Sequence, residues 1–284
     1  MKSQLIIERK IIDLSTQQKK LVDAGWGKSI SETTFTEKIV YLSDGIKVIG
    51  YVSYPKNIQE RLPCIVWNRG GARKRGMIDE FSACGIFGKI ASWGYIVFAS
   101  MYRGSVKSCG CDMFGGDDVN DVLNLIPLAE EFEQADTSKW GMEGWSRGGL
   151  MTYLALMQSS IFKCAVVSGG ITDLGAIYNT NKLFNVHYKD FFPIENIAEN
   201  LAKRSPIHFA NKLPFETKYL LLHGASDDVV PVNQSLKLAE IFSELNYNYR
   251  LVVFEKGDHY LKRHRKEADE MKRKFFSEEL SGKH

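Results

Sequence analysis

Residues 140–156 read WGMEGWSRGGLMTYLAL, and this stretch decides how the rest of the chain is interpreted. A short apolar run leads into Trp145, and a segment of helical character follows Ser146. Glycines stand two positions before and two positions after the serine. Small residues there avoid clashes where a strand turns sharply into a helix, and such a turn leaves the serine hydroxyl exposed at the edge of a sheet. The stretch therefore predicts a strand–turn–helix unit with Ser146 as a candidate nucleophile. The alternative is a glycine-rich turn without chemistry.

Apolar strand patterns alternate with helical patterns along most of the chain. Residues 38–55 read as two strands around the turn Ser43-Asp44-Gly45. Further strands are expected at 63–68, 95–102, 140–146, 164–170, 218–224 and 249–257. Helices are expected at 81–93, 117–133, 147–158 and 232–246 and from Tyr260 onward. Asp117 or Asp118 is a suitable N-cap for the second of these helices. This alternation predicts an α/β fold with a mostly parallel central sheet, helices on both faces and an antiparallel edge.

Two segments depart from the alternation. Residues 1–35 are polar and partly helical, and we expect an N-terminal helical cap on an α/β domain of residues 36–284. Residues 171–214 contain no convincing strand but several aromatic residues. They predict a helical insertion over the carboxyl edge of the sheet, where open α/β folds bind ligands. Such an insertion would act as a lid or pocket wall, or would pack its aromatic side chains into the core.

Composition and charge exclude several classes of protein. The net charge is +3 over 284 residues, without a concentrated basic stripe, so no nucleic-acid partner is expected. The N-terminus lacks a long apolar signal region and no stretch reaches 18 apolar residues, so we expect a cytoplasmic protein with no membrane partner. The five cysteines are odd in number and scattered, which argues against a disulfide framework. Cys109 and Cys111 lack a second Cys/His pair at matching spacing, so no metal is expected.

A serine hydroxyl needs a base to become a nucleophile, and the base needs an orienting acid. In hydrolases built around such a turn, the order along the chain is serine, acid, histidine, each after a strand. Asp227 follows the strand expected at 218–224, and His259 follows the last strand. We therefore predict a catalytic triad of Ser146, Asp227 and His259, with Asp228 and Asp258 as weaker candidates for the acid.

The other histidines fit the role of base less well. His223 ends a strand before a glycine and reads as structural. The remaining four lie in the insertion before the acid, in a charged helix, or at the chain end: His187, His208, His264 and His284.

The oxyanion of the reaction needs backbone N–H donors. One is expected from Arg147, next after the nucleophile, and the other from the loop Asn68-Arg69-Gly70-Gly71. Arg69, Arg73, Arg103 and Arg147 are all expected near the pocket mouth, where guanidinium groups would bind a carboxylate-bearing substrate. The alternative is that some of them pair with Asp112, Asp117 or Asp118 and hold loops. The candidate substrate-binding residues are Trp145, Tyr102, Arg103 and Arg73.

Three further motifs resemble those of the prolyl oligopeptidase family of α/β-hydrolases. HGASDDVVPVNQS at 223–235 resembles the family segment whose first aspartate, here Asp227, is the triad acid. MYRGSVKSCGCDMFGGDDVNDV at 101–122 resembles its Tyr-Arg-Gly-Ser stretch with a glycine-rich loop and an Asp-Val helix, and RSPIHFANKLP at 204–214 its Ser-Pro segment. The resemblance covers Lys38 to the C-terminus and implies an α/β-hydrolase fold and a serine peptidase.

The chain also departs from that family in three places. The 37 residues before Lys38 are too few for the β-propeller of the larger peptidases. The family's Gly-Gly-Ser-Tyr-Gly-Gly becomes residues 144–149, with arginine after the serine, and its oxyanion loop becomes Arg69-Gly70-Gly71. Where relatives use a tyrosine hydroxyl on the oxyanion, this chain offers an arginine. We expect a serine hydrolase of a short peptide or small-molecule ester without a cofactor. A carboxylesterase and a catalytically silent binding protein are the alternatives.

Overall fold

A computed structural model describes residues 4–105, 107–192 and 194–280. The ends of the expected cap and domain at 1–3 and 281–284, and position 193 of the expected insertion, lie outside these residues, as does His284. The strands are β1 (Ile6–Ile11), β2 (Thr34–Ser43), β3 (Ile46–Pro55), β4 (Leu62–Asn68), β5 (Ile96–Ser100), β6 (Ala135–Trp145), β7 (Phe162–Ser168), β8 (Lys218–Gly224) and β9 (Tyr249–Phe254). The main helices are α1 (Thr16–Trp26), α2 (Ile30–Thr33), α3 (Glu80–Ala91), α4 (Asp118–Leu123), α5 (Leu125–Leu128), α6 (Arg147–Leu156), α7 (Leu174–Thr180), α8 (Lys182–Tyr188), α9 (Ile197–Lys203), α10 (Pro206–Phe209), α11 (Asn233–Glu244) and α12 (Arg265–Leu280).

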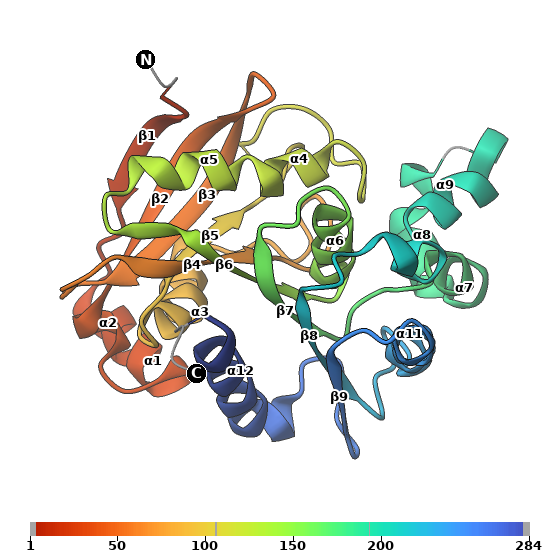
Figure 1. The fold of residues 1–284 in the computed structure, drawn as a ribbon. Helices are drawn as coiled ribbons and strands as arrows, with labels where there is room; N and C mark the ends of the chain where they lie inside the picture. The colour runs from red at the N-terminus through yellow and green to blue at the C-terminus, as the bar shows by residue number, and fades with distance from the viewer. Residues whose placement is uncertain (1–3, 106, 193, 281–284) are drawn as a thin grey trace.

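The described strands form one mixed sheet in the order β1-β2-β3-β5-β4-β6-β7-β8-β9 (Figure 1). Along this order, neighbouring strands from β1 to β5 pair antiparallel. Neighbouring strands from β5 through β4 to β9 pair in parallel. The β2–β3 turn uses Asp44 and Gly45, both at positive φ, as two-residue hairpins require. The expectation of an α/β-hydrolase fold with a mostly parallel sheet and an antiparallel edge is confirmed.

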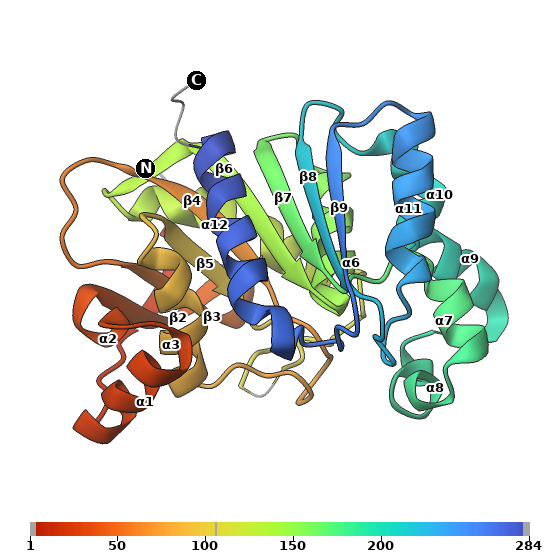
Figure 2. The ribbon, with the colours of Figure 1, turned by 90° about the horizontal axis from the view of Figure 1, so that it is seen from below.

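The side chains of successive strand residues point to opposite faces of the sheet and pack into two separate cores, one on each face. On one face, α3 and α12 cover a cluster that includes Phe87, Ile90 and Phe276 (Figure 2). On the other face, α4, α6 and α11 cover a larger cluster around Phe98 and Trp140. The helices on both faces leave the carboxyl ends of the parallel strands free to carry loops, and the candidate site lies there.

The N-terminal segment contains a strand that the sequence analysis did not predict. Strand β1 pairs antiparallel with β2 at the edge of the sheet, before helices α1 and α2 begin. Its residues after Ile6 are all exposed, and its charges hid the strand pattern. Arg9 reaches Glu37 on β2 and lies 4.2 Å from the ring centroid of Phe132. Charged side chains are a common way to protect an edge strand from pairing with other chains.

The helix expected at 117–133 is broken. It forms α4, α5 and a 3-10 turn, Ala129–Glu131. Pro127 lies within α5 and cannot donate a backbone hydrogen bond. Neither Asp117 nor Asp118 caps α4 through its side chain, because the Asp118 carboxylate is used elsewhere.

The described part of the insertion is mostly helical, with α7, α8, α9 and α10 between β7 and β8. Its aromatic side chains gather around Phe114, which belongs to the loop before α4. Ring centroids lie 5.2–5.8 Å from that of Phe114 for Phe184, Tyr188, Phe191 and Phe192. The insertion is therefore anchored to the core by the aromatic packing that the sequence analysis gave as an alternative.

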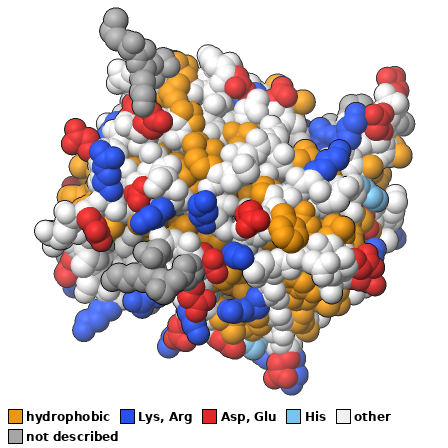
Figure 3. Space-filling model, in the orientation of Figure 1, with side chains coloured by type: hydrophobic (Ala, Val, Ile, Leu, Met, Phe, Trp, Pro, Cys, Tyr) orange, Lys and Arg blue, Asp and Glu red, His pale blue; other side chains and the backbone are white. Residues whose placement is uncertain are grey.

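The molecular surface mixes charges of both signs. On the face drawn in Figure 3, Lys and Arg side chains are interspersed with Asp and Glu. Within the described part of the chain, no helix combines the length and the apolar character that crossing a membrane would require.

Candidate active site

Ser146 lies on the tight turn between β6 and α6. Its φ of 59° and ψ of −123° are strained for a residue with a side chain. A Cβ atom on Gly144 would lie 2.2 Å from the carbonyl oxygen of Gly148, and one on Gly148 would lie 1.9 Å from that of Asn68. The two glycines are therefore required sterically, and the turn holds Ser146 at the carboxyl edge of the sheet.

Asp227 and His259 lie on the loops after β8 and β9. The Oδ2 atom of Asp227 is 2.7 Å from Nδ1 of His259. The Oδ1 atom accepts hydrogen bonds from the backbone N–H groups of Val229 and Val230, at 3.0 and 2.8 Å. Burial alone would raise the pKa of Asp227, but hydrogen bonds with His223 and His259 outweigh it and hold this pKa well below its usual value. Asp227 is therefore a fixed carboxylate that orients the ring of His259.

Trp145 holds His259 from a second direction. Its indole N–H donates to the backbone carbonyl of His259 at 3.0 Å, and the two ring centroids are 5.0 Å apart. Gly169 closes the other side, since a Cβ there would lie 3.3 Å from both Asp227 Oδ2 and His259 Nδ1. Trp145 is thus a positioning residue for the imidazole and does not line the pocket that contains Ser146.

His223 contacts Asp227, the candidate acid. The sequence analysis did not predict this contact. Its Nε2 is 3.3 Å from Asp227 Oδ2, and its Nδ1 is 2.7 Å from the hydroxyl of Ser235. The spacing of four residues between His223 and Asp227 across a strand end is the signal that could have indicated this contact. The imidazole is fully buried, so His223 supports the carboxylate from below.

The other candidates for the base and the acid have contacts of their own or line a pocket. His264 contacts the carbonyl of Glu255, and His208 lines a separate pocket beside α7 and α9. Asp258 accepts a hydrogen bond from the backbone of Lys262. His187 and Asp228 do line the pocket that contains Ser146.

The loop after β4 lies directly beside the serine. A Cβ on Gly70 would be 3.2 Å from Cβ of Ser146 and 2.9 Å from the indole ring of Trp145. The Arg69 guanidinium, in contrast, is buried among backbone carbonyls of Met101, Gly70, Arg73 and Arg75. Burial, together with the nearby charge of Arg147, lowers the pKa of Arg69 to about 10. The Arg69 side chain therefore holds the loop and does not replace the tyrosine hydroxyl of the family; only backbone groups of this loop reach toward Ser146.

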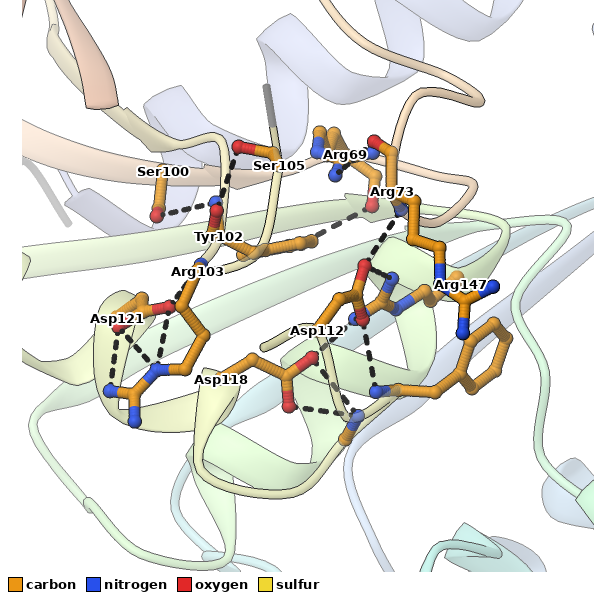
Figure 4. Close-up of polar contacts among 12 residues, drawn as sticks. Arg69, Arg73, Ser100, Tyr102, Arg103, Ser105, Asp112, Asp118, Asp121 and Arg147 are labelled. Carbon is orange, nitrogen blue, oxygen red and sulfur yellow. Dashed lines mark hydrogen bonds and ion pairs between the residues drawn. The ribbon is translucent and has the colours of Figure 1, made fainter. Parts of the chain in front are cut away.

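The Arg147 side chain forms a buried ion-pair cluster with two carboxylates from the loop before α4 and its first turn (Figure 4). Its two terminal nitrogens lie 2.9 and 2.7 Å from the oxygens of Asp112, and one of them also contacts Asp118. All three side chains are at most 1% exposed. Burial lowers the pKa of Arg147, but the two carboxylates more than offset it, so the net shift is upward. This arginine therefore anchors the start of α6 and does not face a substrate.

Arg103 and Tyr102 are also removed from the set of substrate-binding residues. The Arg103 guanidinium binds Asp121 at 2.8 Å (Figure 4) and Asp44 at 2.7 Å. The Arg103 side chain is 9% exposed. Tyr102 is fully buried and donates its hydroxyl to the carbonyl of Arg69. The acids that neutralise Arg103 are distant from it in the sequence. The local pattern therefore did not show that its charge is already paired, and placed it at the pocket mouth.

Two adjoining pockets lie at this edge of the molecule, and Ser146 lines the inner one. The inner pocket has a volume of about 200 Å³. Besides Ser146, its lining includes apolar residues of three segments: Phe114, Ile171, Ile177, Phe184, Val229 and Val230. The outer pocket, of about 600 Å³, contains Arg73, Lys74 and Arg75. His187 and Tyr188 of α8 line both, so the insertion forms the wall between them.

Cys109 and Cys111 are exposed on the loop before α4, and both are free thiols. Among residues 4–105, 107–192 and 194–280, no group of three His, Cys, Asp or Glu side chains is placed to hold a metal ion.

Comparison with known proteins agrees with this architecture. Residues 86–283 match the prolyl oligopeptidase family of peptidases, and the chain belongs to that family. It is similar to the uncharacterized peptidase YtmA of Bacillus subtilis, with 27% identity over 78% of this chain and 85% of that protein. It is also similar to Homo sapiens dipeptidyl peptidase 8, with 28% identity over 76% of this chain and 26% of that protein. The expectation of a hydrolase enzyme of this family is confirmed.

Solved structures give the same result. The Pyrococcus horikoshii acylaminoacyl peptidase superimposes with a TM-score of 0.75 at 26% identity, over 88% of this chain and 42% of that one. An acylaminoacyl peptidase in complex with Z-Gly-Gly-Phe-chloromethyl ketone matches equally well, with the same TM-score, identity and coverage. The chain thus spans less than half of these structures and about a quarter of dipeptidyl peptidase 8, but most of YtmA.

Proposed function

We propose that the chain is a serine hydrolase that cleaves ester or amide bonds, with short peptides as the first substrate class. Ser146 attacks the carbonyl carbon, and His259 takes the hydroxyl proton and returns it to the leaving group. Asp227 orients His259 and stabilises its cationic form. Water then attacks the acyl-enzyme, with His259 as general base. The hydrogen bond of 2.7 Å between Asp227 and His259 carries this proposal, supported by the strained turn that holds Ser146 next to Trp145, whose indole contacts His259.

The oxyanion would be held by backbone donors. The N–H of Arg147 lies at the start of α6, where the helix dipole also favours negative charge. The second donor would come from Gly70, whose approach to Ser146 leaves no room for a side chain. The buried ion pairs of Arg147 and the carbonyl contacts of Arg69 fix both peptide groups before the substrate binds, and such preorganisation is what stabilises the transition state.

Peptides come first because the relatives are named peptidases and one solved relative carries a peptide chloromethyl ketone. The inner pocket supports a second candidate, a carboxylesterase, because about 200 Å³ suits one side chain or a short acyl chain. We further propose that the 171–214 insertion determines substrate choice, since Ile177, Phe184 and Tyr188 line that pocket.

The test is labelling of the purified protein with a fluorophosphonate, followed by mapping of the labelled peptide by mass spectrometry. Ser146→Ala and His259→Ala are the matched variants. Labelling at Ser146 that is lost in both variants supports the proposal. If the folded wild-type protein is not labelled, the proposal fails and a binding role on the hydrolase fold takes its place. The ratio of kcat/KM for an ester and an anilide with the same acyl group then separates esterase from peptidase.

A further inference from the structure

The outer pocket carries positive charge that the mechanism above does not use. We call it the basic vestibule and define it by Arg73, Lys74 and Arg75 together with His187 and Tyr188. All three cationic side chains are exposed. Within the described part of the chain, none of the three pairs with a carboxylate, although most other arginines near the site do. This charge is therefore available to a ligand.

The acid in the lining of the vestibule does not cancel this charge. Asp112 contributes to the wall, but its side chain is 1% exposed and bound to the Arg147 guanidinium. Burial would raise the pKa of Asp112, but Arg147 outweighs burial and lowers it, so this carboxylate stays ionised within the buried cluster. The exposed side chains of Arg73, Lys74 and Arg75 thus give the vestibule an excess of positive charge.

Arg73, Lys74 and Arg75 lie on a loop that is held in place by hydrogen bonds. The Arg69 guanidinium donates to the carbonyls of Arg73 and Arg75 at 3.3 and 3.1 Å, from the buried side of the loop. The Arg73 backbone N–H donates to Asp112 at 2.8 Å (Figure 4), and the Arg73 guanidinium lies 4.3 Å from the ring centroid of Phe191. A cation held by an aromatic face keeps its donors free for an anion. The vestibule is therefore prepared for a ligand before one binds.

The vestibule adjoins the inner pocket, because His187 and Tyr188 line both. A substrate whose apolar part fills the inner pocket beside Ser146 can extend past α8 into the vestibule. The lining of the inner pocket also includes the exposed Asp228, which repels an anion and so favours placing the anionic end of a substrate in the vestibule.

We propose that the substrate of this hydrolase is an anionic acyl donor: a carboxylate attached to the acyl side by an apolar chain, bound by Arg73 and Arg75 in the basic vestibule. This deepens the proposed function and rests on it. The sequence predicts a carboxylate-bearing substrate with Arg69, Arg73, Arg103 and Arg147 near the pocket mouth. Of these four arginines, the proposal assigns only Arg73 to binding of the carboxylate.

The experiment compares p-nitrophenyl esters of adipic, suberic and sebacic acid whose far end is either a free carboxylate or a carboxamide. The two ends have nearly the same size, so the ratio of their kcat/KM values isolates the charge. We expect wild type to prefer the carboxylate by about tenfold for at least one chain length, the effect of one charge-assisted hydrogen bond. Salt at 0.5 M lowers only the rate for the anion.

Arg73→Gln combined with Arg75→Gln removes the charges from exposed positions, and we expect the ratio of kcat/KM for the carboxylate ester to that for the carboxamide ester to fall to about one. Arg73→Lys with Arg75→Lys keeps most of the preference. Arg250→Ala is the matched control, because it removes an exposed arginine from strand β9, outside both pockets. Equal or faster cleavage of the carboxamides by wild type at every chain length would overturn the proposal.

Binding separates this proposal from the proposed function. Suberic acid monoamide is titrated calorimetrically into wild type, Ser146→Ala and the double glutamine variant. Heat of binding that is lost in the glutamine variant supports the anion site, even if no ester is cleaved and Ser146 is not labelled. If wild type neither binds the monoamide nor prefers anionic esters, the vestibule proposal is wrong, whether or not Ser146 reacts with a fluorophosphonate.

Discussion

Replacement of Arg147 by methionine tests the buried ion-pair cluster most directly. Methionine replaces the aliphatic stem of Arg147 by a similar unbranched chain but leaves the carboxylates of Asp112 and Asp118 without their cation. Neither carboxylate side chain is more than 1% exposed. Removing one partner of a buried ion pair costs about 3–5 kcal/mol. Asp112 keeps backbone donors at 2.8 and 3.1 Å and Asp118 keeps one at 3.0 Å, which lessens the penalty for each. We expect the free energy of unfolding to fall by about 4 kcal/mol at pH 7.5.

The loss should depend on pH in a defined direction. Without the cation, burial and mutual repulsion raise the pKa of the two carboxyl groups above about 3.9, the value in the unfolded chain. The folded variant then binds more protons than the unfolded variant, so its stability increases as the pH falls through the raised pKa values. Relative to wild type, the destabilisation should be clearly smaller at pH 5.5 than at pH 7.5.

The assay is urea denaturation followed by tryptophan fluorescence and circular dichroism at both pH values. The control is the triple variant Arg147→Met, Asp112→Asn, Asp118→Asn, which removes the unpaired charges and should recover about half of the lost stability. A loss of less than about 1 kcal/mol at pH 7.5, or a loss of equal size at both pH values, would refute the reasoning, since it would mean that water reaches these carboxylates.

Three smaller changes probe the site itself. Asp227→Asn should lower kcat by about 10⁴-fold without unfolding the protein, because an amide cannot hold the imidazole in the required tautomer; a drop of less than tenfold, measured with an activated ester, would remove Asp227 from the triad. Gly70→Ala should lower kcat/KM by about 100-fold, since its Cβ would lie 2.9 Å from the Trp145 ring and move the loop away from Ser146; unchanged kinetics would argue against this loop as an oxyanion donor. Trp145→Phe should lower kcat by up to about tenfold, because it loses the hydrogen bond to the His259 carbonyl; an unaltered kcat with a lower melting temperature would indicate a packing role only.

The fold could be predicted from the sequence because its signals are local. The alternation of strands and helices and the glycines around Ser146 depend on residues that are neighbours in the chain. Strand β1 escaped prediction because its partner β2 is distant in the chain and because the exposed charges of Glu8, Arg9 and Lys10 lie on both of its faces. Its apolar signal is reduced to a single fully buried side chain, Ile6.

The candidate site divides in the same way. Strand ends place Asp227 and His259 side by side, as their order along the chain predicts. The arginines could not be assigned, because a guanidinium on an exposed loop and one buried against carboxylates have the same local sequence. Arg103 meets Asp44 from 59 positions away, and Arg147 meets Asp112 from 35 positions away. Only the folded chain shows that Arg73 stays accessible while the other three are enclosed.

The enclosure of Arg147 also has an evolutionary consequence. The guanidinium contacts two buried carboxylates, so replacing Arg147 alone would leave both Asp112 and Asp118 without their cation. Relatives that carry tyrosine after the nucleophile should therefore lack at least one of these acids. The three positions should be inherited as a unit, and that co-variation would mark the branch of the family to which this chain belongs.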